Sequence, residues 1–465
     1  MLFPTIEYFI FFIIVFFLNW GTYAKLNIRN ILLILASLFF YGFWDYRFVG
    51  LILISSITNY GIILLLFKYN KLITRKFYLI LACILNFGIL AFFKYYTFLL
   101  VSLENTFHYF NQSVNLPYIQ GIILPVGISF FTFQIMSLVI DVYTGKITKL
   151  YSLTEVILYI CFFPQLVAGP IVRAEEFLPQ LETPRDPNKI DSSRAFILIG
   201  FGLFKKVLIA NYISVLLVDP VYENPGFYSV PNLFLAIYGY SIQIYCDFSA
   251  YSDIAIGTAL LLGFNFPDNF NSPYRADSLQ DFWRRWHISL SGWLRDYLYI
   301  PLGGSKNGKF NTYKNLMITM LLGGLWHGAA WSFVIWGGLH GMMLSAERIL
   351  AKLNFKVPKI IKIIFTFHFV SFCWIFFRAG SWEKTVEFFS AFKTTNSEID
   401  FINPFAVSVL VLGFITHYIP EKWENKVHSI AELSPILRGI VFTLLLIILA
   451  AVSGEGVPPF IYFQF

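Results

Sequence analysis

Charged residues are scarce in this sequence. Asp, Glu, Lys and Arg together make up 13% of its 465 residues, whereas soluble domains contain about 25%. Hydrophobic residues make up 57% and aromatic residues 20%. This composition excludes an ordinary soluble protein and predicts an all-α polytopic membrane protein. We expect a single membrane-embedded domain over residues 1–465.

Cysteine and the common catalytic motifs are also scarce or missing. The four cysteines lie far apart in apolar segments and show no metal-ligand spacing, so we interpret them as small buried hydrophobes. The sequence contains no GxSxG, HExxH, P-loop or dinucleotide fingerprint. We therefore expect no bound metal and no phosphoryl transfer. The cysteines are Cys83, Cys161, Cys246 and Cys373.

Long apolar runs are what the sequence has in abundance. They predict about 11–12 transmembrane helices, some of them tilted or kinked because their runs are shorter than about 20 residues. The stretch "LYICFFPQLVAGPIV", 158–172, is broken by Pro164, Gly169 and Pro170, which predicts a re-entrant element packed in protein. The predicted spans cover about residues 3–20, 30–44, 48–67, 77–100, 119–140, 195–218, 232–262, 314–326, 331–346, 363–377, 404–419 and 436–453.

The basic residues orient these spans. The formal net charge is +7, and in a membrane protein such an excess gathers in cytoplasmic loops rather than indicating nucleic acid. With twelve crossings, the Lys and Arg residues between the spans fall on one side if both termini lie outside. The basic residues that fix this orientation are Lys25, Arg29, Lys68, Lys71, Arg75, Lys76, Lys146, Lys149, Arg348, Lys352, Lys356, Lys359 and Lys362.

One amphipathic segment does not read as a simple span. Residues 273–310 combine Arg284, Arg285 and Arg295 with several tryptophans and tyrosines. This pattern is typical of a segment that lies in the membrane interface, here on the cytoplasmic side. Anionic lipid headgroups are one ligand that its arginines could bind.

Two of the seven histidines are candidates for chemistry. His327 lies in "GGLWHGAAWSFVIWGGLHG", 323–341, where a buried imidazole costs free energy unless it has a partner or a task. Gly323, Gly324 and Gly328 would let another backbone or a ligand approach it closely. His287 lies between an arginine pair and two serines, and the alternative is an interfacial histidine at headgroup level.

The other five histidines are expected to be structural or solvated. His340 and His368 lie in apolar helices, where a bond to a neighbouring carbonyl or hydroxyl is the expected role. His108, His417 and His428 lie at loop edges and are expected to be solvated.

Four charged residues fall within apolar runs. Asp247 and Asp253 lie in "YCDFSAYSDIAIG", 245–257, and Lys205 and Lys206 in "GLFKKVLIAN", 202–211. Charges at such depth pair with one another or line a pathway. The alternatives are snorkelling lysines and a structural hydrogen-bond network around the aspartates.

Together these motifs carry a family resemblance. "DFWRRWHISLSGWLRDYLYIPLGG", followed by "GLWHGAAWSFVIWGGLHG", resembles the membrane-bound O-acyltransferase family, in the bacterial branch that includes alginate and peptidoglycan O-acetyltransferases. "QLVAGPIVR", 165–173, and the terminal "FIYFQF" are similar to that branch as well. The resemblance implies helices and re-entrant segments around a central tunnel, in a bacterial cytoplasmic membrane.

The resemblance also assigns roles to residues. The family's catalytic histidine maps onto His327, and its second polar position maps onto His287, which would position the donor or polarise its carbonyl. Histidine suits the removal of a hydroxyl proton near neutral pH. Tyr462, near the C-terminus, is implied as an acyl relay, with an interfacial anchor as the alternative.

The resemblance further implies substrates and partners. The donor would be acetyl-CoA, whose phosphates Arg284, Arg285 and Arg295 could bind. The acceptor would be an extracytoplasmic polysaccharide, reached through a separate SGNH-type transferase. A transporter would explain the intramembrane charges, but the sequence shows no repeat. A non-enzymatic scaffold for polysaccharide export is the third possibility, and it would not consume a thioester.

The charge pattern makes a topological prediction. Residues 68–76 and 273–310 should face the cytoplasm. In a cysteine-free background, a single cysteine at Asn307 should resist an impermeant thiol reagent in intact cells and react after the membrane is opened. Reaction in intact cells would contradict this orientation.

Overall fold

The computed structural model describes residues 3–112, 114, 116, 119, 121–167, 169–306, 308–353, 356–393, 403–419, 439, 440 and 443. All regular structure in these residues is helical, which confirms the predicted all-α class. The helices before residue 188 are α1 (Ile6–Gly21), α2 (Leu26–Asp45), α3 (Arg47–Lys68), α4 (Leu72–Leu90), α5 (Tyr96–Tyr109), α6 (Ile128–Thr144), α7 (Leu153–Cys161), α8 (Phe163–Leu166) and α9 (Ala174–Phe177). Those that follow are α10 (Ser192–Phe204), α11 (Asn211–Ile213), α12 (Asp219–Glu223), α13 (Val230–Leu261), α14 (Leu279–Arg285), α15 (Ile288–Leu294), α16 (Gly308–His327), α17 (Trp331–Leu350), α18 (Lys359–Ala379), α19 (Trp382–Ala391) and α20 (Pro404–His417).

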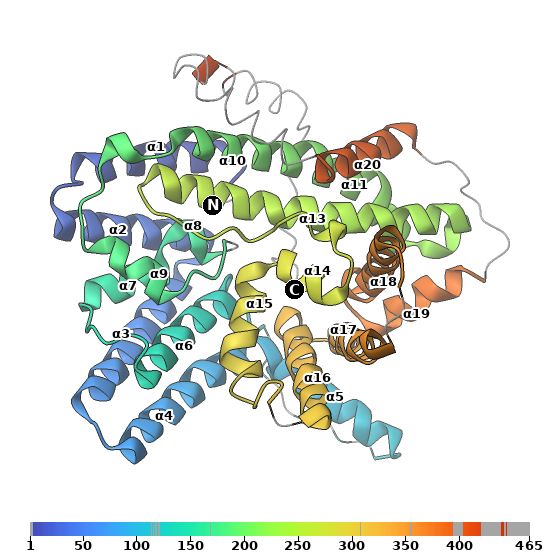
Figure 1. The fold of residues 1–465 in the computed structure, drawn as a ribbon, viewed down its shortest axis with the longest axis horizontal. Helices are drawn as coiled ribbons and strands as arrows, with labels where there is room; N and C mark the ends of the chain where they lie inside the picture. The colour runs from blue at the N-terminus through green and yellow to red at the C-terminus, as the bar shows by residue number, and fades with distance from the viewer. Residues whose placement is uncertain are drawn as a thin grey trace. The chain divides into compact units, whose positions relative to one another are not determined.

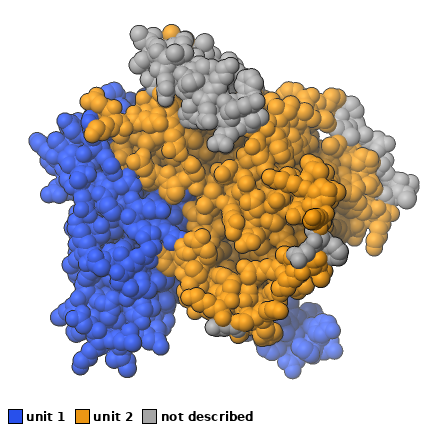
Figure 2. Space-filling view, viewed as in Figure 1, with its two compact units in different colours: residues 1, 10–187 blue, residues 2–9, 188–465 orange. Residues whose placement is uncertain are grey.

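The chain divides into two compact units. The first comprises residues 1 and 10–187, and the second comprises residues 2–9 and 188–465 (Figure 2). Both histidines singled out in the sequence belong to the second unit, which therefore contains the candidate site. The single domain over residues 1–465 stays a prediction.

Five helical segments of the described chain are long and apolar enough to cross a membrane. Three shorter apolar helices, α1, α6 and α20, accompany them. The protein is therefore a multi-pass membrane protein, as predicted. The predicted span at 436–453 lies outside the described residues, and the total of 11–12 spans stays a prediction. The five segments are Leu26–Asp45, Arg47–Lys68, Leu72–Tyr109, Ser192–Glu223 and Lys359–Ala379.

The predicted break in residues 158–172 is present in the first unit. Helix α7 ends at Cys161, and only the short helix α8 follows it. Side chains satisfy the backbone groups that the break releases: Gln165 Nε2 donates to the Tyr159 carbonyl at 2.6 Å, and the Phe163 N–H donates to Ser37 Oγ at 3.1 Å. Irregular backbone at membrane depth requires such partners from the protein.

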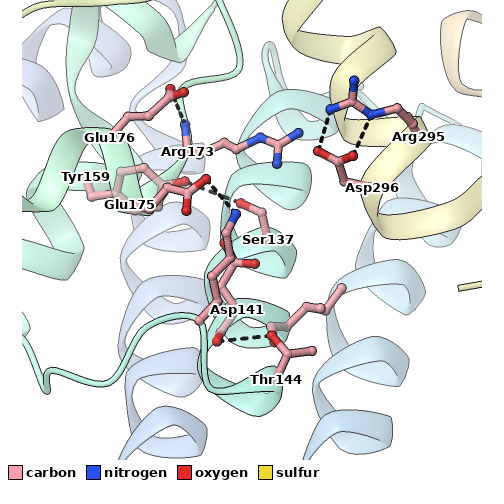
Figure 3. Close-up of polar contacts among 11 residues, drawn as sticks. Ser137, Asp141, Thr144, Tyr159, Arg173, Glu175, Glu176, Arg295 and Asp296 are labelled. Atoms are coloured by element: carbon pink, nitrogen blue, oxygen red, sulfur yellow. Dashed lines mark hydrogen bonds and ion pairs between the residues drawn. The ribbon is translucent and has the colours of Figure 1, made fainter. Parts of the chain in front are cut away.

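Ion pairs and a hydrogen bond hold the segments around this break. The Tyr159 hydroxyl donates to the Val172 carbonyl at 3.0 Å, and Lys146 pairs with Glu175 at 2.5 Å. Figure 3 shows Tyr159 and Glu175 in this region. Lys149 pairs with Glu182 at 2.9 Å and thereby lowers the pKa of that carboxyl group. The loop after α6 is thus tied to the segment that begins with α9.

Residues 273–310 form several short helices rather than one surface helix. Helices α14 and α15 are followed by a π-helical turn at Arg295–Tyr299. Trp286 and Trp293 are only 1% and 5% exposed, and Trp286 packs against Trp374 of α18 with ring centroids 5.0 Å apart. These two rings therefore pack inside the second unit, and the interfacial position of the segment stays a prediction.

Helices α10 and α13 run side by side in the second unit (Figure 1). The run from Ser192 to Glu223 includes two π-helical turns, Lys205–Ala210 and Ser214–Val218. Single π-turns inside longer helices frequently occur at functional sites. Here the first of them places both intramembrane lysines against α13.

Candidate active site

His327 is the last residue of α16 and is buried, with 3% of its surface exposed. Its ring contacts those of Trp326, Trp336 and Phe377, with centroids 5.0, 5.1 and 5.3 Å away. These rings come from α16, α17 and α18. The imidazole thus lies in an aromatic cluster that three helices build.

Glycines bring α16 and α17 together beside His327. A Cβ atom on Gly324 would lie 3.2 Å from the Cα atom of Gly337, and one on Gly337 would overlap the Met320 carbonyl. A Cβ atom on Gly328 would overlap the Phe333 ring. The predicted close approach of another backbone is therefore confirmed at Gly324.

His287 is fully buried at the N-cap of α15. Its φ of +41° lies in the left-handed region, which is strained for a residue with a side chain. The ring stands edge-on to Phe248, with centroids 4.6 Å apart, and lies 6.1 Å from the ring of Trp326. His287 thus packs inside the second unit rather than at its surface. Trp326 contacts the rings of both candidate histidines.

Asn269 holds the ring of His287 and determines which nitrogen carries the proton. The backbone N–H of Ser289 donates to Asn269 Oδ1 at 3.2 Å, so this atom must be the amide oxygen, and Nδ2 donates to Ser252 Oγ. His287 Nδ1 lies 3.2 Å from the same oxygen and must donate to it. In the neutral ring the proton is therefore on Nδ1, and Nε2 is the basic nitrogen.

His417 corrects the sequence interpretation. It was expected to be solvated, but it is 3% exposed, and its Nε2 accepts the backbone N–H of Tyr274 at 3.1 Å. Tyr418 donates to the Tyr274 carbonyl at 2.8 Å. The end of α20 thus folds back onto residue 274, a contact 143 residues away that local sequence does not reveal.

The other histidines lie in structural or exposed positions. His368 bonds to the Ile364 carbonyl at 2.7 Å, as expected, and His108 is exposed. His340 is fully buried, but its partner is the indole N–H of Trp283 at 3.3 Å rather than a carbonyl or hydroxyl. His428 and Tyr462 lie outside the described residues.

The four intramembrane charges form two ion pairs. Lys206 pairs with Asp247, and Lys205 pairs with Asp253, each at 2.5 Å. Both lysines are buried, so the snorkelling alternative is wrong. Pairing between the two segments therefore accounts for these four charges within the second unit.

The three arginines proposed to bind donor phosphates differ in their contacts. Arg285 pairs with Asp281 at 2.8 Å, and Arg295 pairs with Asp296 at 2.6 Å (Figure 3). Arg284 is exposed and has no ion pair within the described residues. Among the three, Arg284 therefore has the most available positive charge.

Comparison with known proteins identifies the family. The model of the membrane-bound O-acyltransferase family matches residues 145–380. A probable alginate O-acetylase AlgI of Pseudomonas putida is 35% identical over 469 residues, which cover 94% of each chain. The chain belongs to the membrane-bound O-acyltransferase family. It is therefore an enzyme that transfers an acyl group to an oxygen atom.

Other family members carry different names. Peptidoglycan O-acetyltransferase of Helicobacter pylori is 37% identical over 76% of this chain and 72% of its own. Teichoic acid D-alanyltransferase of Bacillus subtilis is 29% identical over 53% of this chain and 67% of its own. His287, Asn269 and His327 all lie within the region matched by the family model.

The importance of Asn269 was missed by the sequence interpretation. It lies 18 residues before His287, in a loop between α13 and α14. An asparagine in a loop usually caps a turn, so the residue type gave no sign of its partner.

Asn269 should therefore control the protonation of His287. Burial lowers the pKa of His287 to about 3, so the wild-type profile should show no limb from this residue above pH 5. In Asn269→Asp, a carboxylate accepts the Nδ1 proton and stabilises the imidazolium, so the pKa of His287 should rise and the rate should fall toward pH 5. Asn269→Leu should lower the rate about 10–100-fold, as loss of a histidine's orienting partner does. Acylation rates from pH 5 to 9, at matched protein levels, measure both effects.

Asn86→Leu is the matched control. Asn86 is 3% exposed and pairs with Asn59 in the first unit, so its loss tests the general effect of removing a buried asparagine. If Asn269→Asp and Asn269→Leu both keep the wild-type rate and profile, Asn269 does not position His287.

Proposed function

We propose that this protein transfers an acetyl group from cytoplasmic acetyl-CoA to an extracytoplasmic polysaccharide, by way of a separate SGNH-type transferase. The family membership establishes O-acyl transfer, and the names of the relatives support acetyl as the group and a cell-envelope or secreted polymer as the acceptor. We place the protein in the bacterial cytoplasmic membrane, with both termini outside.

The observation that carries this proposal is the arrangement of two buried histidines around one tryptophan. The rings of His287 and His327 both contact that of Trp326, although 40 residues separate them in the sequence. Both imidazoles are shielded from bulk solvent, and such shielding strengthens electrostatic interactions and keeps water from competing for the acyl group.

His327 acts as the base. It accepts the proton of the attacking hydroxyl while the oxygen forms a bond to the acyl carbon. The bond between carbon and sulfur then breaks, and the thiolate receives that proton, so that an ester and a thiol result. Proton transfer of this kind contributes about 10²–10⁴ to the rate.

The hydrogen bonds of His287 favour one of its two implied roles. With its proton on Nδ1, the neutral ring offers a lone pair at Nε2. A lone pair can accept a hydrogen bond from an attacking hydroxyl or from an N–H group of the acyl donor. It cannot polarise a carbonyl oxygen, because that oxygen needs a group that donates a hydrogen bond to it. His287 therefore positions a reactant.

The acyl group must also leave the site on the outer side. Tyr462, near an outward-facing C-terminus, is the acyl relay in this scheme. A phenol, with an ordinary pKa of about 10, is a better leaving group than a sugar hydroxyl. An acetyl-tyrosine would thus lie between thioester and sugar ester in energy. On the cytoplasmic side, Arg284 holds a phosphate of acetyl-CoA, and Arg285 and Arg295 of the same segment assist it.

Replacement of His327 tests the enzyme assignment. In His327→Ala, acylation of the polymer and thioester consumption by the purified protein should fall about 10²–10⁴-fold, because the base is lost. His287→Ala should lose less. His368→Ala is the control, since His368 is exposed and its hydrogen bond runs to a carbonyl of its own helix. Full acylation by His327→Ala at equal expression would refute the assignment.

Replacement of Tyr462 separates a relay from an anchor. Tyr462→Phe keeps the apolar ring and deletes the phenolic oxygen, so a relay should lose nearly all polymer acylation while donor binding persists. An anchor should tolerate the change, at about 0.5–1.5 kcal/mol for one hydrogen bond. Phe460→Leu, which trims an apolar ring and removes no hydroxyl, should affect an anchor but not a relay. Wild-type acylation by Tyr462→Phe would exclude the relay.

A further inference from the structure

One surface of the second unit is strongly basic. Residues 297–362 contain eight Lys and Arg residues and one acidic residue, Glu347. The Glu347 carboxylate accepts the backbone N–H groups of Leu279 and Gln280, so it is already engaged at the start of α14. None of the eight forms an ion pair with another described residue. We call these eight residues the basic surface: Lys306, Lys309, Lys314, Arg348, Lys352, Lys356, Lys359 and Lys362.

The basic surface lies at one end of three packed helices. α16 begins at this end, α17 runs back beside α16 and ends there, and α18 begins there after a short connection. Two side-chain contacts join the parts: Arg348 donates to Ser305 Oγ at 3.2 Å, and Lys352 donates to the Tyr313 hydroxyl at 3.3 Å. The cations therefore form one continuous surface rather than three separate groups.

The basic surface also lies where a membrane span begins. α18 is one of the five candidate spans, and its first residue is Lys359. Lys352 lies seven residues before that start, and Lys356 lies between them. Lysines that flank the start of a span lie at the level of the lipid headgroups, because their ammonium groups stay in water while the apolar residues that follow enter the hydrocarbon.

A well-held turn adds exposed apolar side chains to this end of the helices. Ile300 and Leu302 are 54% and 41% exposed, and Phe310, at the start of α16, is 79% exposed. Asn315 Nδ2 donates to the Leu302 carbonyl at 3.1 Å and to the Gly304 carbonyl at 3.0 Å, which fixes the backbone of the turn. Apolar groups held outward beside lysines are typical of a surface that enters the membrane interface.

We propose that the basic surface binds anionic phospholipids, with the headgroup phosphates on its lysines and the acyl chains along Ile300, Leu302 and Phe310. Clusters of four to eight cations next to a membrane span attract anionic headgroups, and a phosphate accepts hydrogen bonds from several ammonium groups. A soluble acidic protein would match the charge but not the exposed apolar side chains at the headgroup level. Lipid binding here goes beyond the proposed function and does not depend on acyl transfer.

Lipid titration of the purified full-length protein tests this proposal. Phosphatidylglycerol and phosphatidylcholine with the same fluorescent label and acyl chains are added to the detergent-solubilised protein, and each Kd is measured from energy transfer between tryptophan and the label. Lys306→Gln/Lys309→Gln should weaken phosphatidylglycerol binding about fivefold for each lysine removed and leave phosphatidylcholine binding unchanged. Added salt should weaken the binding of phosphatidylglycerol alone, because it screens exposed charges.

Lys146→Gln/Lys149→Gln is the matched control. It changes the net charge by the same amount, but both lysines lie in the first unit and already pair with glutamates. Phosphatidylglycerol binding should therefore keep its wild-type Kd. Phe310→Ser tests the apolar part of the surface and should weaken the binding of both lipids by a similar factor, because it removes a contact with their acyl chains.

The outcomes separate lipid binding from other uses of the basic surface. A wild-type Kd for phosphatidylglycerol in Lys306→Gln/Lys309→Gln would overturn the proposal, and so would an equal loss in Lys146→Gln/Lys149→Gln. A higher KM for acetyl-CoA in Lys306→Gln/Lys309→Gln, with lipid binding unchanged, would assign the surface to the acyl donor instead. If the wild-type protein consumes no thioester but binds phosphatidylglycerol through these lysines, the proposed function fails and the lipid site stands.

Discussion

Within the apolar interior of this protein, the buried charges and His287 depend on other parts of the chain for their partners. Only 13% of the residues are charged, and two buried lysines are held by two aspartates of α13. Breaking a buried ion pair costs about 3–5 kcal/mol, because it leaves a charge with no compensation. Both lysines lie in one π-helical turn, which directs these two adjacent residues toward α13. Each buried lysine can therefore reach an aspartate of that helix.

The same requirement shapes the surroundings of the histidines. His287 is held by Asn269, which in turn is held by Ser252 of α13, so the ring orientation depends on helices far apart in the sequence. The backbone of His287 adopts a left-handed conformation. Such strain persists only where the surrounding structure imposes it, and it is concentrated at functional sites. The network and the strain together indicate that the position of this imidazole is specifically maintained.

Aromatic packing and close helix contact organise the rest of the site. The contact of Gly324 with Gly337 lets α17 approach α16 at the level of His327, and this brings Trp336 against the imidazole. Apolar interiors made of large rings leave few polar contacts of their own.

The sequence by itself determined the helical membrane fold and the broken segment at 158–172, because composition and hydrophobic run length carry this information. Its local motifs also predicted the role of His327. It also gave the family, since the tryptophan-rich motifs lie within continuous stretches. Only the tertiary structure decided that His417 is buried, that Trp286 packs inside the protein, and which nitrogen of His287 is basic. Each of these depends on a partner far away in the chain: Tyr274 for His417, Trp374 for Trp286 and Asn269 for His287. Hydrogen bonds and ring contacts between distant segments leave no periodic trace in a single sequence, so they become visible only when the chain is folded.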